Sequence, residues 1–246
     1  MSNKEITQFA NPVSPLVTTY IGSTRVNPVL WEPTTKDYIQ DGLIAHWDCI
    51  ENVERGGGHN SSSTVWKDLT DNGYDLNLTS KASFGDNCLI SQNAKATAVG
   101  TKYLPNYYTI EIVLKPVKQE NMVVFIPQNS SSVRLFVICF DNNIMNFQVK
   151  TGMHWYKTNR AIGQICSCAA TYGNDNPANY YANGITAIDS GKWANWSARS
   201  ITGITISDSN TFYYKGNIYS IRTYDRALSR AEIAHNYAID KIRFGL

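Results

Sequence analysis

Lys215-Gly-Asn-Ile-Tyr-Ser-Ile-Arg-Thr-Tyr-Asp-Arg-Ala-Leu-Ser-Arg-Ala-Glu-Ile-Ala-His-Asn-Tyr237, close to the C-terminus, is the stretch that decides the fold. Its first part alternates with the period of a strand that lies between a buried face and a more polar one. After a sharp turn, Ser229 is placed to be the N-cap of a helix, and Glu232 is placed to complete a capping box. Leu228 and Ile233 can pack together as a hydrophobic staple. The stretch therefore predicts a strand, a turn and a helix of about three turns that packs on the rest of the chain.

Strand-like runs separated by turn signals continue this pattern upstream. Asn142-Asn143 and Asn183-Gly184 are typical of tight hairpin turns, because Asn and Gly tolerate positive φ at little cost. The spacing of the runs is that of an antiparallel β-sandwich, so we expect an all-β fold. The predicted strands are 43–49, 75–79, 88–91, 107–115, 122–127, 134–140, 144–150, 163–172, 179–182, 185–188, 201–207 and 215–224.

Several of these segments carry a resemblance to a known superfamily. Asp41-Gly-Leu-Ile-Ala-His-Trp47, residues 64–78, residues 180–187, the proline-terminated strand 108–116 and the C-terminal stretch resemble laminin G-like members of the concanavalin A-like lectin/glucanase superfamily. The resemblance covers roughly residues 41–246. It implies a two-sheet antiparallel jelly-roll sandwich that is often used as a binding module. It says little about function, because the same fold carries lectins, adhesion modules, glycoside hydrolases and virion proteins.

The composition agrees with one large domain and points to no charged partner. All-β domains of up to about 250 residues are common, and this chain has 246. Charged residues make up 17% and the formal net charge is +2. Such a weak field would not attract nucleic acid or an anionic membrane surface, so we expect neither partner.

Residues 1–40 differ from the rest and are expected to form an extended arm. Pro12, Pro15, Pro28 and Pro33 are half of the eight prolines, and proline favours extended over helical backbone. The arm could lie along its own domain, pair with a neighbouring subunit in a homo-oligomer, or dock onto a larger assembly. A disordered terminus is the plainer alternative, although the segment is more apolar than a typical disordered tail. The expected organisation is therefore an arm of 1–40 and a sandwich of 41–246.

Neither the hydropathy nor the N-terminus points to a membrane or a secretory route. No run reaches the roughly 18 apolar residues of a membrane span, and the first residues have no apolar core of a signal peptide. We therefore expect a soluble protein made in a reducing cytoplasm, which a virion or another assembly could display. The five cysteines are expected to be free thiols that act as small buried hydrophobes rather than a zinc site. They are Cys49, Cys88, Cys139, Cys166 and Cys168.

The residues of a glucanase active site are missing. Glucanases of the resembled superfamily use a Glu-x-Asp-x-x-Glu strand motif, whose carboxylates lie on one face of a strand at the short separation that retention requires. Glu111 lies in a comparable strand, but Val113 stands where the second carboxylate would be. There is no Gly-x-Ser-x-Gly elbow, no phosphate-binding Gly-rich loop and no His-Glu-x-x-His motif. We therefore expect no catalytic residues.

Two segments combine aromatic rings with amide groups, as sugar-binding sites do. Sugar rings stack their C–H faces on aromatic side chains, while their hydroxyl groups bond to Asn, Asp and backbone groups. Residues 153–157 and 191–197 are expected to be loops that supply such groups. The predicted ligand-binding residues are Trp155, Tyr156, Trp193, Asn195 and Trp196. The alternative is that the tryptophans fill the edges of the sandwich, since Trp is highly buried on average.

One oxygen-rich cluster could hold a structural calcium ion. It consists of Asp68, Asp71, Asn72 and Asp75, which do not have the spacing of an EF-hand. The same residue types commonly form turns through hydrogen bonds from side chain to backbone. No metal or other cofactor is therefore assigned.

Three functions from different classes remain open at this point. The first is a non-enzymatic module that binds carbohydrate, a glycosylated surface or a protein surface. The second is a structural or surface-display protein of a larger particle, such as a phage capsid decoration or fibre, attached through residues 1–40. The third, a glucanase-type glycoside hydrolase, is disfavoured by the missing carboxylates.

Overall fold

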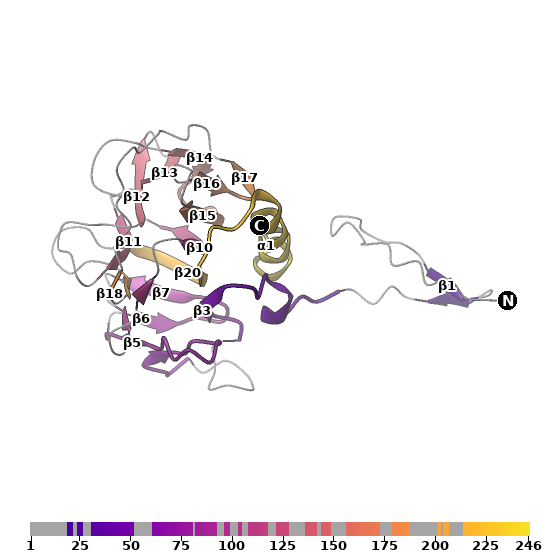
Figure 1. Cartoon of the computed structure of the whole chain (residues 1–246), viewed down its shortest axis with the longest axis horizontal. Helices are drawn as coiled ribbons and strands as arrows, with labels where there is room; N and C mark the ends of the chain where they lie inside the picture. The colour runs from indigo at the N-terminus through magenta and orange to yellow at the C-terminus, as the bar shows by residue number, and fades with distance from the viewer. Residues whose placement is uncertain are drawn as a thin grey trace.

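The computed structural model describes much of the chain as two antiparallel sheets and one helix (Figure 1). The described residues are 19–21, 24–26, 31–51, 61–80, 82–92, 96–98, 103–104, 108–117, 122–127, 136–141, 144–148, 156–172, 179–186, 201–202, 204–206 and 214–246. All statements on the structure refer to these residues.

The first sheet has the longest strands and is built around β10 and β20. Its order is β17 (Ile185–Thr186), β16 (Asn179–Ala182), β15 (Cys166–Tyr172), β10 (Tyr108–Pro116), β20 (Lys215–Tyr224), β7 (Leu89–Gln92) and β6 (Ala82–Phe84). An eighth strand, β3 (Leu43–Asp48), pairs with the second half of β20, while β7 pairs with the first half. Two shorter strands thus share one side of β20.

The second sheet has the order β14 (Tyr156–Ala161), β13 (Ile144–Gln148), β12 (Phe136–Asp141), β11 (Met122–Pro127), β19 (Ile204–Ile206), β8 (Ala96–Ala98), β5 (Leu76–Leu78) and β4 (Val65–Trp66). Two small ladders join β1 (Thr19–Ile21) to β2 (Thr24–Val26) and β9 (Tyr103–Leu104) to β18 (Ile201–Thr202). Every pairing among the described strands is antiparallel.

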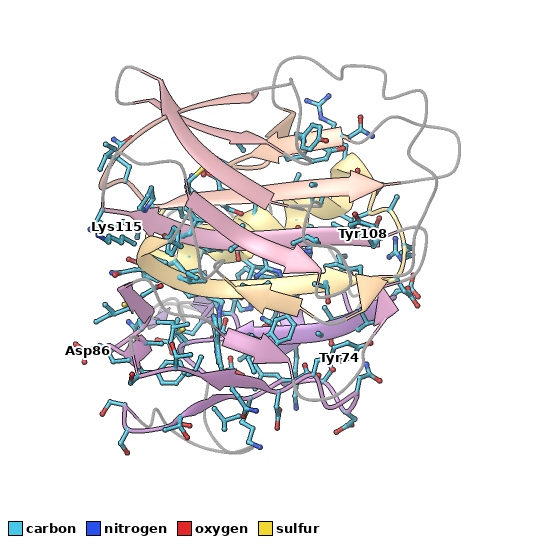
Figure 2. The ribbon with its side chains drawn as sticks, turned by 90° about the vertical axis from the view of Figure 1, so that its left-hand side faces the viewer. Tyr74, Asp86, Tyr108 and Lys115 are labelled. Atoms are coloured by element: carbon cyan, nitrogen blue, oxygen red, sulfur yellow. The ribbon has the colours of Figure 1, made fainter. Side chains whose placement is uncertain are left out.

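The two sheets pack face to face around one apolar core. Ile110, Ile112 and Leu114 alternate along β10 and reach a core cluster that also contains Trp66 of β4 and Leu76 of β5. Figure 2 shows the two layers with α1 (Arg230–Phe244) behind them. The expectation of an all-β antiparallel sandwich with a C-terminal helix is therefore confirmed.

The C-terminal helix begins as the sequence predicts. Ser229 accepts a hydrogen bond from the backbone N–H of Glu232, and the Glu232 carboxylate accepts one from the backbone of Ser229. Leu228 and Ile233 are buried in one apolar cluster, as a staple requires. The helix is longer than the expected three turns, because its 15 residues continue to Phe244 and end at Gly245, which has the left-handed φ of +68°.

Most predicted strands are present, with shifts at their ends. Asn183 and Gly184 form the expected hairpin turn, with φ of 51° and 70°. The predicted turn at residues 142–143 lies outside the described residues, although the ladder between β12 and β13 starts at the pair Asp141 and Ile144 that flanks it. Short strands such as β4, β6, β8 and β14 were not predicted. β4, β6 and β8 have two or three residues, too few to show a clear alternation, and the six residues of β14, Tyr-Lys-Thr-Asn-Arg-Ala, do not alternate between apolar and polar side chains.

Residues 33–40, named here the strap, lie against the sandwich and α1. The strap contains a single 3-10 turn, Thr35–Asp37, whose capping box is closed by Thr34 and Asp37. Tyr38 is only 2% exposed, and its hydroxyl group donates a hydrogen bond to Asp240 of α1 over 2.8 Å. The last part of the expected arm is therefore held on the folded domain.

Candidate functional site

The densest group of polar side chains lies between the first sheet and α1. Glu111 of β10 and Arg222 of β20 are direct cross-strand neighbours on the face that α1 covers. Arg222 Nε donates to Glu111 Oε2 over 2.8 Å, and both residues are at most 2% exposed. Asn236 of α1 donates to the same Glu111 oxygen over 2.8 Å. A buried ion pair thus connects two central strands to the helix.

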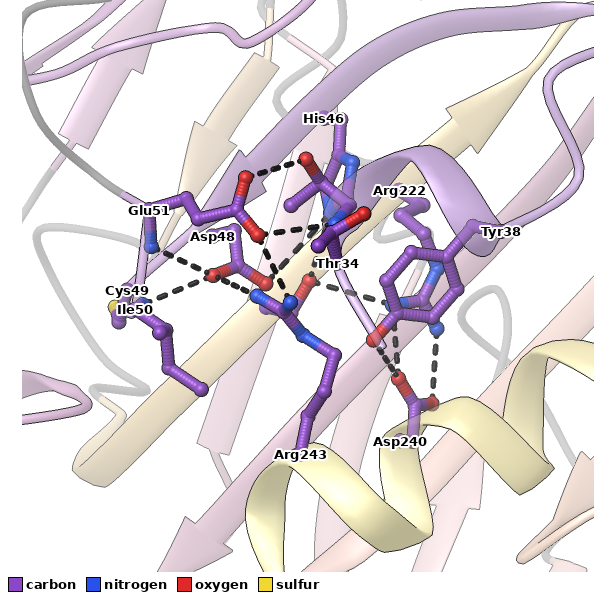
Figure 3. Close-up of polar contacts among 12 residues, drawn as sticks. Thr34, Tyr38, His46, Asp48, Cys49, Ile50, Glu51, Arg222, Asp240 and Arg243 are labelled. Carbon is purple, nitrogen blue, oxygen red and sulfur yellow. Dashed lines mark hydrogen bonds and ion pairs between the residues drawn. The ribbon is translucent and has the colours of Figure 1, made fainter. Parts of the chain in front are cut away.

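Asp240 of α1 completes this group, and Figure 3 shows its contacts with Arg222 and Tyr38. Its two oxygens accept hydrogen bonds from Arg222 Nη1 and Nη2 over 2.9 and 2.8 Å, the bidentate geometry that suits Arg and carboxylate. They also accept bonds from the hydroxyl groups of Tyr38 and Ser167, each over 2.8 Å. The guanidinium carbon of Arg222 lies 3.9 Å from the centroid of the Tyr38 ring. Asp240 therefore ties the strap and two strands to the helix.

A second ion pair lies toward the C-terminal end of α1. Arg243 Nη2 donates to Asp48 Oδ1 over 2.8 Å, and Arg243 Nη1 donates to Glu51 Oε1 over 2.9 Å and to the carbonyl oxygen of Pro33. Glu51 in turn accepts bonds from the backbone N–H and the hydroxyl group of Thr35. This arrangement fixes the end of β3, the start of the strap and the last turns of α1 together (Figure 3).

Burial dominates the electrostatics of the group. It raises the pKa of Glu111 and that of Asp48 above their ordinary values, against the opposing effect of Arg222 and Arg243 respectively. Burial, reinforced by the two arginines, lowers the pKa of His46 well below its usual value, so this histidine is neutral. The charged forms of these side chains are therefore stabilised by their ion-pair partners and not by water.

Ser220, His46 and Asp48 have the residue types of a hydrolytic triad but not its geometry. His46 Nε2 lies 3.3 Å from Ser220 Oγ and 3.8 Å from Asp48 Oδ2, so both contacts use the same ring nitrogen. A triad needs one nitrogen for the nucleophile and the other for the acid. The three residues are at most 1% exposed. The geometry supports a structural role for them.

Glu111, the carboxylate considered as a glucanase residue, faces α1 and is bonded to Arg222 and Asn236. It lies opposite a helix and not in an open groove. Its side chain cannot reach a sugar while α1 is in place.

The residues considered for calcium organise the free edge of β3. Asp68 is buried and accepts hydrogen bonds from the backbone N–H groups of His46, Thr70 and Tyr74. Asn72 and Thr70 donate to the carbonyl oxygen of Ile44 in β3. These contacts agree with the turn interpretation, since they satisfy edge groups that no strand pairs. No group of three or more His, Cys, Asp or Glu side chains within the described residues could hold a metal ion.

The side chains of four of the cysteines are described, and all four are free thiols. Cys166 and Cys168 point into the core, with their sulfur atoms 3.5 Å apart. Cys49 is also a core residue, and Cys88 is half-buried. The described cysteines thus include three small buried hydrophobes, as expected, while Cys139 belongs to β12, whose side chains are not described.

The predicted aromatic binding residues lie outside the described residues, apart from the backbone of one. Trp155, Trp193, Asn195 and Trp196 are not described, and Tyr156 is the first residue of β14 rather than a loop residue. Its backbone pairs with that of Phe147 in β13.

The strand ends that lead into the two aromatic segments nevertheless lie at the same end of the sandwich. β10 runs from Tyr108 to Pro116, and Tyr108 and Lys115 mark opposite ends of the sandwich in Figure 2. The antiparallel ladders from β10 through β15 and β16 make β17 run toward the Tyr108 end. Residues 187–200 therefore leave β17 at this end.

The second sheet gives the same result for residues 149–155. The five residues that join β10 to β11 are too few to return along the nine residues of β10, so β11 starts at the Lys115 end. The antiparallel ladders from β11 to β14 then place the end of β13 and the start of β14 at the Tyr108 end. Figure 1 shows β14, β16 and β17 at one edge of the sandwich.

The sequence did not indicate the buried ionic group. A signal was present, because Asn236, Asp240 and Arg243 recur at helical spacing on the face that also carries Ile233. Which charged residues of the strands would meet them could not be read from the chain, since the pairs are far apart in sequence.

Comparison with known proteins gives structural matches and no sequence match. No protein-family model matches the chain, and no curated protein matches it. Among solved structures, a mutant of Trypanosoma rangeli sialidase with trans-sialidase activity has a TM-score of 0.62 at 14% identity, over 82% of this chain and 33% of that one. This chain therefore spans about a third of the sialidase.

Two further matches are smaller proteins or domains. Domain 4 of AbnA, a GH43 extracellular arabinanase from Geobacillus stearothermophilus, was solved with arabinotriose. It has a TM-score of 0.56 at 15% identity, over 80% of this chain and 98% of that one. The binding domain of Paraclostridial Mosquitocidal Protein 1 has a TM-score of 0.57 at 14% identity, over 80% of this chain and 52% of that one. At these identities the likeness establishes the fold alone. No helix in the described residues is long and apolar enough to cross a membrane.

Proposed function

We propose that this chain is a non-enzymatic carbohydrate-binding module with a concanavalin A-like sandwich. Its ligand is a glycan or a glycosylated surface, bound at the Tyr108 end through Trp155, Tyr156, Trp193, Asn195 and Trp196. The observation that carries the proposal is the topology: residues 149–155 join the end of β13 to the start of β14 at the Tyr108 end, and residues 187–200 leave β17 at the same end. Aromatic rings and amide groups brought to one end are what recognition of a sugar requires.

The comparisons support the same class of function. Domain 4 of the arabinanase matches over nearly its whole length and was solved with a sugar, arabinotriose. Sugar binding by a domain of this size needs no catalytic carboxylates. The one strand carboxylate considered for catalysis, Glu111, is bonded to Arg222 beneath α1, which also favours binding over hydrolysis.

A glycan array followed by calorimetry tests the proposal. We expect saturable binding to at least one oligosaccharide, with arabino-oligosaccharides and sialosides included because of the structural matches. Trp155→Ala and Trp193→Ala should each weaken binding at least about tenfold, the loss of a binding hot spot. Trp31→Ala is the matched control, because Trp31 is 48% exposed and belongs to neither aromatic segment. Absence of binding across the array, or an equal loss in the Trp31 variant, would contradict the proposal.

Attachment to a larger assembly through residues 1–40 is a second proposal. The strap is bonded to α1 and to Glu51, so any partner of the preceding residues would be connected to the sandwich at a fixed point. Sedimentation of the full chain and of a chain that begins at Trp31 tests this idea. We expect the full chain alone to form a larger species, and equal masses for the two chains would contradict it.

A further inference from the structure

The strap is attached to the folded domain in an unusual way. Beyond its turn into β3, its described hydrogen bonds to the rest of the chain all use a side chain of the partner. Thr35 bonds to Glu51, Tyr38 to Asp240 and the backbone N–H of Ile39 to Asn236. His235 and Arg243 contact the carbonyl oxygens of Asp37 and Pro33. A few side chains can therefore hold or release the whole segment.

Glu51 is the carboxylate among these holding groups that solvent reaches. Its side chain is 38% exposed, whereas Asp240 and Asn236 are fully buried. Its two oxygens accept three bonds: from the Thr35 backbone N–H, from the Thr35 hydroxyl group and from Arg243 Nη1. Protonation of Glu51 occupies one of these oxygens with a hydrogen and removes its ion pair with Arg243. The Pro33 carbonyl, which Arg243 also holds, is then less firmly fixed.

The groups around Glu51 determine how its pKa is shifted and therefore how the strap responds to pH. Arg243 bonds to it from α1, and Asp48, at the end of β3, lies close enough to repel its negative charge. Partial burial raises the pKa of Glu51, but the hydrogen bonds from Thr35 and Arg243 outweigh it and lower the pKa below its ordinary value. The contribution of Glu51 to the closed strap is therefore present above the usual carboxylate pKa and is lost as the pH falls through the lowered value.

The core between the sheets does not depend on the strap. Ile110, Ile112 and Leu114 pack on the opposite face of the first sheet, away from Tyr38 and α1. Opening of the strap would expose the Tyr38 ring and admit water to Arg222 and Asp240, with which Tyr38 is in contact. Regions that are held by few contacts commonly open without global unfolding.

We propose that residues 33–40 form an acid-released strap, which protonation of Glu51 frees from α1 while the two sheets stay folded. The strap thereby couples the attachment of the preceding residues to the protonation of one carboxylate.

Hydrogen exchange of the full chain at neutral pH tests this proposal with Glu51→Gln, which reproduces the uncharged side chain. The backbone amides of Thr35 and Ile39 should exchange at least about tenfold faster than in the wild type, the effect of losing a charge-assisted hydrogen bond. Amides of Ile112 and Ile221 in the central strands should be unchanged. Trypsin should also cleave faster after Lys36, an exposed residue of the strap.

Two further variants keep the result interpretable. Thr35→Val removes one bond to Glu51 without changing any charge, and it should accelerate the same amides. Glu232→Gln is the matched control. Glu232 also accepts hydrogen bonds from an arginine, Arg226, and from a backbone N–H, that of Ser229, but it lies at the other end of α1. Unchanged strap amides in both strap variants would overturn the proposal. Equal acceleration of the strap and the central strands would also overturn it, because the strap would then open only with the whole domain.

Discussion

Two neighbouring rungs of the ladder between β10 and β20 carry opposite chemistry. Ile112 pairs with Ile221 and faces the core between the sheets, whereas Glu111 pairs with Arg222 and faces α1. All four side chains are buried. The apolar rung gains from burial with any well-fitting neighbour, while the charged rung is stable only with its own partners in place. The difference indicates that the core drives folding of the sandwich and that the ionic group fixes where α1 and the strap dock.

The largest expected effect comes from breaking the charged rung. Arg222→Met leaves Glu111 and Asp240 buried without their shared cation, so the free energy of unfolding should fall by about 3–5 kcal/mol. Urea denaturation followed by circular dichroism measures it. A loss below about 1 kcal/mol would mean that the ion pair contributes no more than a surface pair.

A cavity at the apolar pair of Ile112 and Ile221 should lower the free energy of unfolding somewhat less. Ile112→Ala removes buried methyl and methylene groups from the core and should destabilise the fold by about 2–4 kcal/mol. Ile112→Val is the graded control, with an expected loss of about 1 kcal/mol. If the two variants were equally destabilised, lost volume could not be the cause.

A smaller change tests the contact between strap and helix. Tyr38→Phe keeps the ring on Arg222 and removes only the hydrogen bond to Asp240, so stability should fall by about 1–2 kcal/mol. Thermal unfolding measures the change, with Tyr74→Phe as a control at a tyrosine that does not contact α1 in Figure 2. An unchanged melting temperature for Tyr38→Phe would show that Asp240 is satisfied by its other donors.

The smallest effect concerns the exposed start of α1 and depends on pH. The hydrogen bond from Arg226, together with the Ser229 cap, lowers the pKa of Glu232 to about 2. Because the pKa is lower in the folded state, Glu232 stabilises the fold above its ordinary pKa, and this contribution is lost as the pH falls toward about 2. Glu232→Gln should therefore show a flatter dependence of stability on pH between about 4.5 and 2. Parallel curves for variant and wild type would contradict the assignment.

Local features of the fold could be predicted from the sequence. The cap at Ser229 and the turn at Asn183 and Gly184 depend on residues within a few positions of one another, so their signals are complete in a short window. The long strand β20 was predicted with its observed ends, because its alternation extends over ten residues. The shortest strands, such as β4, gave no such pattern.

The ionic group could not be predicted because its partners are set by the fold. Arg222 and Glu111 are 111 positions apart, and Arg243 and Asp48 are 195 apart. The sequence shows that charged residues interrupt apolar strands, but not that Glu111 meets an arginine instead of a substrate. The aromatic site remains a prediction, supported by the strand ends that flank it at the Tyr108 end.

The bond between Tyr38 and Asp240 joins positions 202 residues apart and has a consequence for biosynthesis. The ribosome releases the strap well before α1, because Asp240 follows Tyr38 by 202 positions. Until then, Arg222 and Glu111 have no helix over them and the strap has no surface to bind. Because contacts so distant in the chain are slow to form, we expect this face to close after the strands of the first sheet have paired, and a chain that stops before residue 230 would present its charged rung to water.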